Sequence, residues 1–302
     1  MAAQNVTPVG TNRKPSVFDR IKGTLWCMHP LPGGMYTVAV ATFGVLASLA
    51  RHRVPGLLDM LLISAGTFGT QAAIGATNDF CDLALDTASG RNKPLVRGLI
   101  RPRTALAASV AGTTLALFCG IALGWLPLVL LLSIESLGIA YDVHFKSTPV
   151  SGLLYALYFP LNPLLAWSVF GHWQPFLPWL LPLGAALGIA INFSNSLADL
   201  EEDTRMGVRG LPHLFRQRTG RAVAWGIPLV CVLVIWLLDV GQWVPARFSS
   251  LLVASVCCVA STVAAATLVT LRPAQQTLRT AFLIQAAGIV LMAGGWIASV
   301  AF

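Results

Sequence analysis

Aspartates with helical spacing occur at two places in this chain. In the segment NDFCDLALD, Asp79, Asp82 and Asp86 stand three and four residues apart, so a helix carries all three on one face. Like charges on one helix face repel each other, and near a membrane this costs more. Mg²⁺ relieves the repulsion, because it prefers carboxylate oxygen and usually bridges carboxylates to substrate phosphates. Taken alone, this first cluster, headed by Asn78, fits either a metal–phosphate site or a solvated helix end.

A second cluster repeats this pattern 117 residues further on. In NSLADLEED, Asn195, Asp199 and Asp203 are spaced by four residues, which again predicts one helix face. Together the two segments hold seven of the twelve carboxylates, and each continues into a basic loop, GRNKPLVRG or TRMGVRGLPHLF. We expect a clamp in which carboxylates hold metal and cations contact phosphate oxygens. The cations expected to contact phosphate are Arg91, Lys93, Arg97, Arg209 and, from a third loop, Lys146.

The elements that position these clusters are expected to be membrane helices. Of 302 residues, 56% are hydrophobic and only 11% are charged, with a mean hydropathy of +0.72, whereas soluble domains carry about 25% charged residues. The apolar runs have the length of spanning helices rather than of barrel strands. We predict an all-α polytopic membrane protein with two related halves around a central cavity. The nine expected spans are 24–50, 56–80, 104–123, 125–141, 150–170, 174–198, 221–239, 247–271 and 279–300.

Basic residues predict the orientation of these spans. With the N-terminus inside, 17 of the 20 Lys and Arg residues fall in inner segments, and only Arg51, Arg53 and Arg247 fall in outer loops. The positive-inside rule favours this topology, which places both acidic clusters at the cytoplasmic face. A shared site then explains them better than two solvated helix ends. The net charge of +8 needs no nucleic-acid partner, because orientation and contact with anionic membrane lipid account for it.

The chain before the first span is polar and basic. No small-residue cleavage site follows a short apolar core there, so we interpret residues 1–23 as a cytosolic tail with a short amphipathic helix in SVFDRIKGTLW. Residues 24–302 are then a single transmembrane domain. The six cysteines form no CxxC pair and no Cys/His cluster, so neither disulfides nor zinc are expected.

In its paired motifs the chain resembles the UbiA superfamily of intramembrane prenyltransferases, which includes terpene cyclases. That family is nine-helical and carries NDxxDxxxD after helix 2 and DxxxD after helix 6, each followed by a basic loop. Here the first motif is complete and the second reads DLEED. The loop YDVHFK places Tyr141 and Lys146 where the family often has a tyrosine and a basic residue. GRNKPLVRG departs from the commoner RTxxRP, and WCMHPLPGG lacks an arginine motif of many relatives, so the acceptor stays open.

The resemblance implies an Mg²⁺-dependent prenyltransferase. Metal and cations would stabilise the departing diphosphate of an isoprenyl diphosphate. A dry cavity would protect the allylic carbocation until a lipophilic acceptor, in this family usually an aromatic ring, attacks. The implied metal ligands are Asp79, Asp82, Asp86, Asp199 and Asp203. Asp79, Asp82, Asp199, Asp203, Tyr141 and Lys146 are the implied catalytic residues, and Asn78, Arg91, Lys93, Arg97, Asn195 and Arg209 the substrate contacts.

Other classes explain part of the same pattern. A terpene cyclase of the superfamily would use the same site, with the double bonds of the substrate capturing the cation. A CDP-alcohol phosphotransferase requires a DG…AR run, which this sequence lacks. A cation-coupled transporter favours ionisable groups at mid-bilayer, where Glu135 is the one strong candidate. The sequence leaves open the roles of Glu135 and Asp142, the prenyl chain length and the oligomeric state.

Overall fold

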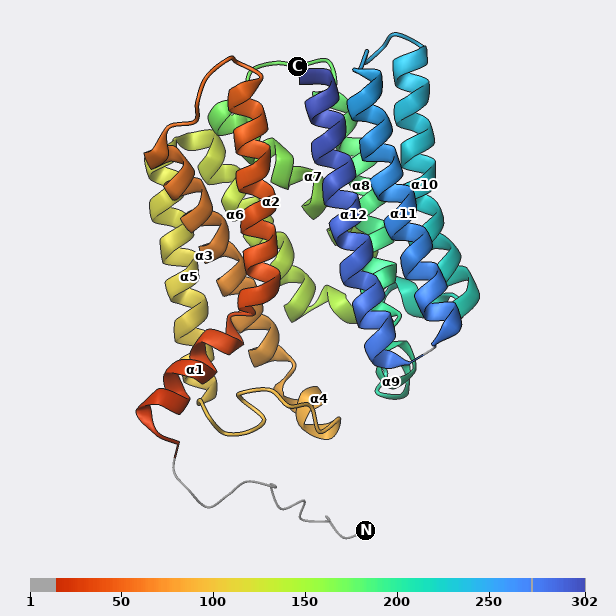
Figure 1. Cartoon of the computed structure of the whole chain (residues 1–302). Coiled ribbons are helices and arrows are strands. Elements are labelled where there is room, and N and C mark those ends of the chain that lie inside the picture. The colour runs from red at the N-terminus through yellow and green to blue at the C-terminus, as the bar shows by residue number, and fades with distance from the viewer. Residues whose placement is uncertain (1–14, 273, 302) are drawn as a thin grey trace.

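The computed structural model describes residues 15–272 and 274–301, and over these residues it is a bundle of helices (Figure 1). Nine helices of this described part are long and apolar enough to cross a membrane, which confirms the predicted fold class. The first fourteen residues of the predicted tail lie outside the described residues. The nine helices are α2 (Pro30–Leu49), α3 (Leu57–Cys81), α5 (Pro102–Leu123), α6 (Trp125–Val143), α7 (Ser151–Phe170), α8 (Leu177–Ser196), α10 (Gln217–Val240), α11 (Phe248–Leu271) and α12 (Gln275–Ala301).

The first predicted span, 24–50, is interrupted. α1 (Val17–Cys27) ends just before His29, whose backbone is left-handed with φ of 50°, and α2 begins at Pro30. Proline lacks the amide hydrogen that a helix interior uses, but it is tolerated in the first helical turn. The sequence HPLPGG therefore begins a new helix, and the spanning part of this segment is α2 alone.

α1 is the expected amphipathic helix. Its start is a capping box, in which the Ser16 hydroxyl accepts from the Asp19 amide at 3.1 Å and the Asp19 carboxylate accepts from the Ser16 amide at 2.9 Å. Phe18 and Trp26 are exposed, whereas Cys27 is buried. The apolar exposed face and the position of α1 at one end of the bundle (Figure 1) are typical of a helix that lies in the membrane interface.

The spanning helices form two groups that α7 joins. Helices α2, α3, α5 and α6 pack together, helices α8, α10, α11 and α12 pack together, and α7 contacts members of both groups (Figure 1). At the same end of each group a spanning helix runs into a short one, α3 into α4 (Leu83–Ala88) and α8 into α9 (Leu200–Arg205). The two acidic clusters occupy these two junctions, so each half of the bundle supplies one of them.

Two glycines bring α3 and α5 into backbone contact. A Cβ atom at Gly69 would lie 2.7 Å from the carbonyl oxygen of Gly112, and one at Gly112 would lie 2.5 Å from the carbonyl oxygen of Gly69. Close packing of small residues is a main basis of helix association in membranes, where lipid removes the hydrophobic driving force between helices. This contact fixes α3, and with it the acidic cluster at its C-terminal end.

We predict that Gly112→Ala lowers the free energy of unfolding by about 1–3 kcal/mol, because a methyl group there meets backbone that has no room to yield. Gly226→Ala in α10 is the matched control, since a Cβ atom at Gly226 meets nothing within 4 Å. Thermal denaturation of both variants in detergent measures the difference. Equal melting temperatures would contradict the tight α3–α5 contact.

Candidate functional site

The first acidic cluster lies at the junction of α3 and α4. Asp82 is the single residue between the two helices: its amide donates to the Asn78 carbonyl at 2.9 Å, and its carbonyl accepts from the Asp86 amide at 2.7 Å, the first hydrogen bond of α4. The one continuous helix predicted for the three aspartates is therefore broken at Asp82, although Asp79 and Asp86 still meet at one lysine, Lys93. Asp79 is 1% exposed and Asp86 is 0% exposed. Carboxylates buried to this degree require cations or metal close by.

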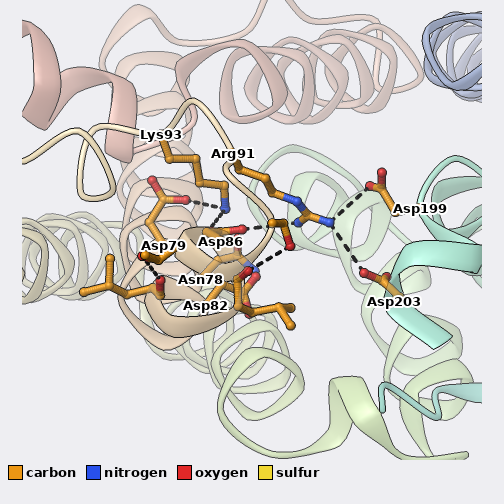
Figure 2. Close-up of polar contacts among 12 residues, drawn as sticks. Asn78, Asp79, Asp82, Asp86, Arg91, Lys93, Asp199 and Asp203 are labelled. Atoms are coloured by element: carbon orange, nitrogen blue, oxygen red, sulfur yellow. Dashed lines mark hydrogen bonds and ion pairs between the residues drawn. The ribbon is translucent and has the colours of Figure 1, made fainter. Parts of the chain in front are cut away.

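Lysines from two loops supply charge to this cluster. Lys93 Nζ lies 2.9 Å from Asp79 Oδ1 and 2.8 Å from Asp86 Oδ2, so it bridges the two carboxylates (Figure 2). Lys146 Nζ donates to Asp82 Oδ2. Burial on its own lowers the pKa of Lys93, but attraction and hydrogen bonds from the two carboxylates outweigh it and raise that pKa above its ordinary value. Lys93 is therefore fully charged at neutral pH.

The second cluster lies at a sharper break in the helix. α8 ends at Ser196, and residues 197–199 form a turn before α9 begins. The continuous helix face predicted for Asn195, Asp199 and Asp203 is therefore wrong at this turn. The Asp199 amide donates to the Ser196 carbonyl three residues back, which is the tighter pattern of a 3₁₀ turn.

A contact with another helix accompanies this break. The Asp199 carboxylate accepts from Gln275 Nε2 at 2.6 Å and from the Arg279 guanidinium at 3.0 Å, both on α12. On the other side, His213 Nε2 lies 3.9 Å from Asp203. Burial raises the pKa of Asp203 above its ordinary value, although Arg91 opposes this, and burial lowers the pKa of His213 despite the attraction of Asp203.

Arg91 connects the two clusters. Its guanidinium lies 3.3 Å from Asp86 on one side, and 3.5 Å from Asp203 and 3.9 Å from Asp199 on the other (Figure 2). Burial lowers the pKa of this guanidinium, but the surrounding carboxylates, Asp199 foremost, more than compensate and raise it. The two halves of the bundle are thus tied at this end by an ion-pair network centred on one arginine.

A cavity of about 100 Å³ opens beside this network. Arg91, Lys146 and Asp203 line it together with Tyr141 and Asn192. Asn192 is only 1% exposed, and within the described residues neither atom of its amide group has a hydrogen-bond partner. Buried polar groups are nearly always paired, so this amide is available to hydrogen-bond a water molecule or a ligand in the cavity.

Aromatic rings continue from this cavity along α7. Tyr141 meets Tyr155 edge-on with ring centroids 5.2 Å apart, and Tyr155 stacks on Phe159 at 6.1 Å. Tyr36 then meets Phe159 at 6.2 Å and Tyr158 at 5.6 Å. All four tyrosines of the chain therefore belong to one aromatic cluster. Faces of such rings attract cations.

Not all the predicted site residues meet the carboxylates. Arg97 and Arg209 are exposed. Within the described residues, 15–272 and 274–301, no ion pair includes either arginine, so the structure does not bring them to the clusters. Asn195 is exposed at the cavity, with its amide 3.5 Å from the Tyr155 hydroxyl. Asn78 donates to Asp142 at 2.8 Å, which connects Asp142 to the first cluster.

The motifs assign no role to two further polar residues, His29 and Glu135. His29 Nε2 lies 2.9 Å from Asp79 Oδ1. His29 precedes Asp79 by 50 residues, and no sequence pattern relates it to the motif. Glu135 lies within α6 and accepts from the Thr113 hydroxyl on α5. Its partner is thus a neighbouring helix, which is the usual arrangement of a buried polar group between membrane helices.

The carboxylates fit a hard divalent cation by their chemistry, because Mg²⁺ prefers oxygen ligands of this type. In the present arrangement, however, no group of three or more His, Cys, Asp or Glu side chains in the described part of the chain is placed to hold a metal ion. Arg91 and Lys93 lie between the carboxylates instead (Figure 2). Metal binding at this site therefore requires these two cations to leave their partners.

Comparisons with known proteins agree with this architecture. The family model described as UbiA prenyltransferase family matches residues 37–286. The chain is 26% identical over 235 residues to digeranylgeranylglyceryl phosphate synthase of Natronomonas pharaonis, covering 75% of this chain and 82% of that protein. It is 27% identical over 164 residues to 4-hydroxybenzoate octaprenyltransferase of Neisseria meningitidis serogroup C, covering 53% of this chain and 55% of that protein.

Solved structures of similar fold include two archaeal ones. A UbiA homologue from Archaeoglobus fulgidus bound to GPP and Mg²⁺ matches with a TM-score of 0.70 and 18% identity, covering 91% of this chain and 99% of that chain. The apo structure of a UbiA homologue from Aeropyrum pernix K1 matches with a TM-score of 0.67 and 17% identity, covering 86% and 96%. At these identities the likeness shows the fold.

We predict that Lys93→Met destabilises the protein when divalent metal is chelated, because the buried carboxylates of Asp79 and Asp86 lose the cation between them. Removing one partner of a fully buried ion pair costs about 3–5 kcal/mol of stability. Because the Lys93 side chain is 22% exposed, we expect the loss of stability in Lys93→Met to be about 3 kcal/mol or less. Thermal denaturation in EDTA measures the change, and excess Mg²⁺ restores more stability to the variant than it adds to the wild type.

Arg97→Met is the matched control for this prediction, because it removes an exposed cation from the same loop. A melting temperature of Lys93→Met equal to that of Arg97→Met in EDTA would contradict the stabilising role of the Lys93 ion pairs.

Proposed function

Because the chain belongs to the UbiA prenyltransferase family, we propose that it is a Mg²⁺-dependent enzyme that transfers an isoprenyl group from its diphosphate to a lipophilic, aromatic acceptor. The observation that carries this proposal is the pair of acidic clusters, one from each half of the bundle, that meet around Arg91. Such a site offers carboxylates for metal and cations for phosphate within one space. It opens toward a cavity and an aromatic cluster that suit a carbocation.

Five aspartates are the residues that would hold the metal. They supply oxygen ligands from both halves of the bundle, so that a bound diphosphate would be enclosed between the halves. When bound, Mg²⁺ supplies Lewis-acid stabilisation of the charge that builds on the leaving diphosphate. The five are Asp79, Asp82, Asp86, Asp199 and Asp203.

Arg91 and Lys93 contact the substrate in this proposal. Both are charged and already lie at the carboxylates, so rotation of their long side chains would bring them to phosphate oxygens and leave the carboxylates free for metal. Arg91 presents a planar fork of donors that matches phosphate geometry. The exchange leaves each buried charge with a partner throughout, which avoids the cost of an isolated buried ion.

The chemical step follows from this placement. The allylic C–O bond breaks, and its electron pair leaves with the diphosphate that Arg91, Lys93 and Lys146 contact. Tyr141 lines the cavity and meets the ring of Tyr155 edge-on, so these aromatic rings would stabilise a positive carbon formed in the cavity. The acceptor then supplies the electron pair of the new bond and loses a proton.

The orientation of the site is also an inference. The chain is an integral, multi-pass membrane protein by its family and its nine apolar helices in the described part. Most basic residues lie at the end of the bundle that carries α4 and α9, and the positive-inside rule favours the cytoplasm for that end. A diphosphate from the cytosol then enters at the polar end, while its prenyl chain extends into the membrane.

We predict that Asp82→Asn and Asp199→Asn each lower Mg²⁺-dependent diphosphate release from a prenyl diphosphate by about 100-fold or more, the size expected when preorganised stabilisation of a leaving group is lost. Glu201→Gln is the control, because Glu201 belongs to the second segment but its side chain is 82% exposed. A coupled pyrophosphatase assay on geranyl, farnesyl and geranylgeranyl diphosphates measures the release. Full activity in either aspartate variant would refute the assignment of the site.

We predict that the organic product contains both prenyl chain and acceptor. Membranes that contain the protein are incubated with each prenyl diphosphate, with and without a lipid extract as the source of acceptor, and products are identified by mass spectrometry. A cyclic hydrocarbon or alcohol that forms without the extract would assign the chain to the terpene cyclases of the superfamily instead.

A further inference from the structure

His29 reaches the first acidic cluster from a different part of the chain. Its Nε2 lies 2.9 Å from Asp79 Oδ1, and because a carboxylate only accepts hydrogen bonds, Nε2 carries the hydrogen. The Asp79 side chain is 1% exposed, whereas His29 is 32% exposed. The histidine therefore connects an almost fully buried carboxylate with the junction of α1 and α2 near the surface.

The fold provides a specific recess for this junction. A Cβ atom at Gly75 of α3 would lie 3.0 Å from both the carbonyl carbon and the oxygen of Met28, and 3.1 Å from Cβ of His29. Only glycine leaves room for backbone at this distance. Gly75 precedes Asp79 by four residues, so both lie on the same face of α3, and the recess sets His29 directly beside the carboxylate.

The backbone of His29 supports the same contact. Its φ of 50° and ψ of 60° are left-handed, a conformation in which His, Asn and Asp are enriched among residues other than glycine. The His29 carbonyl accepts from the Gly33 amide at 3.0 Å, which anchors it to the first turn of α2. On the other side, Cys27 is fully buried against Leu95 and Ile100 of the loop that follows Lys93. The junction is thus held between α3 and that loop.

Asp79 has two partners on the same oxygen, His29 and Lys93, each at 2.9 Å. Under the proposed function Lys93 exchanges this carboxylate for phosphate, while His29 stays in its recess. We propose that His29 is a positioning residue, which holds the Asp79 carboxylate in its metal-binding orientation when Lys93 leaves. This inference rests on the proposed function, since it concerns the carboxylates as metal ligands.

The test compares Mn²⁺ binding by the full-length protein in detergent, with inorganic diphosphate present, using the electron paramagnetic resonance signal of free Mn²⁺. His29→Ala is expected to weaken binding by about tenfold or more, the size seen when a hydrogen-bond partner of a metal ligand is removed. His29→Gln keeps a donor at the reach of Nε2 and binds like the wild type. His29→Asn tolerates the left-handed backbone but is too short to reach, and it binds like His29→Ala.

Gly75→Ala tests the recess independently of the histidine. It displaces the junction and is expected to weaken Mn²⁺ binding as His29→Ala does, and the double variant is expected to bind no more weakly than either single one, because both remove the same contact. Gly34→Ala is the control, since a Cβ atom at Gly34 of α2 meets nothing within 4 Å. Melting temperatures in EDTA identify any variant that fails to fold, and the His29 series decides the question without Gly75→Ala.

Two results would overturn the inference. Unchanged Mn²⁺ affinity in a folded His29→Ala protein would show that Asp79 needs no such partner. Retention of affinity by His29→Asn with its loss in His29→Gln would assign the effect to the backbone turn rather than to the hydrogen bond. Absence of Mn²⁺ binding in the wild type would instead overturn the proposed function, and the inference with it.

Discussion

Buried carboxylates must be neutralised, and this requirement governs the structure around the site. Asp79, Asp82 and Asp86 lie almost wholly out of water, where an unpaired charge costs several kcal/mol. Lys93 and Lys146 neutralise carboxylates of the first cluster. Arg91 pairs with Asp203 of the second cluster, in the other half of the bundle. Under the proposed function, the same carboxylates would bind metal once these lysine and arginine side chains turn to phosphate.

The helical scaffold places both acidic clusters at one end of the bundle, where basic side chains reach them. Each half of the bundle ends a spanning helix at an acidic segment and continues into a short helix and a basic loop (Figure 1). The close contact of Gly69 and Gly112 fixes one of these helices against its neighbour, and Arg279 and Gln275 of α12 hold Asp199 on the other side. Each cluster is therefore supported by helices of its own half, and the Arg91 side chain connects the two clusters.

Sequence reasoning predicted what depends on period and composition. Length and hydropathy predicted the nine spans, and helical spacing predicted that Asp79 and Asp86 meet, which they do at Lys93 although the helix is broken at Asp82. The same reasoning was wrong at Asn195 and Asp199, where a turn interrupts the helix. It had no means to separate Arg91, which bridges the clusters, from Arg97 of the same loop, which is exposed, because an irregular loop has no period.

Contacts between segments that are far apart in the chain were the second kind of feature that could not be predicted from the sequence. His29, at the junction of α1 and α2, and Arg279, on α12, contact the aspartates from distant parts of the chain, and nothing in their local sequence predicts these contacts. HPLPGG does contain a local signal for the helix break, since proline favours a first turn. The metal-binding assignment of Asp79, Asp82, Asp86, Asp199 and Asp203, and the roles of Tyr141 and Lys146, remain predictions.

The central claim is that Arg91 and Lys93 exchange carboxylates for phosphate when metal and substrate bind. The most direct measurement is an experimental structure of the full chain with Mn²⁺ and a non-hydrolysable geranyl thiodiphosphate, in which anomalous scattering locates the metal. The account predicts metal on carboxylates of both clusters and the Arg91 guanidinium on phosphate oxygens, away from Asp203. Metal and diphosphate bound elsewhere, with Arg91 still bridging Asp86 and Asp203, would contradict it.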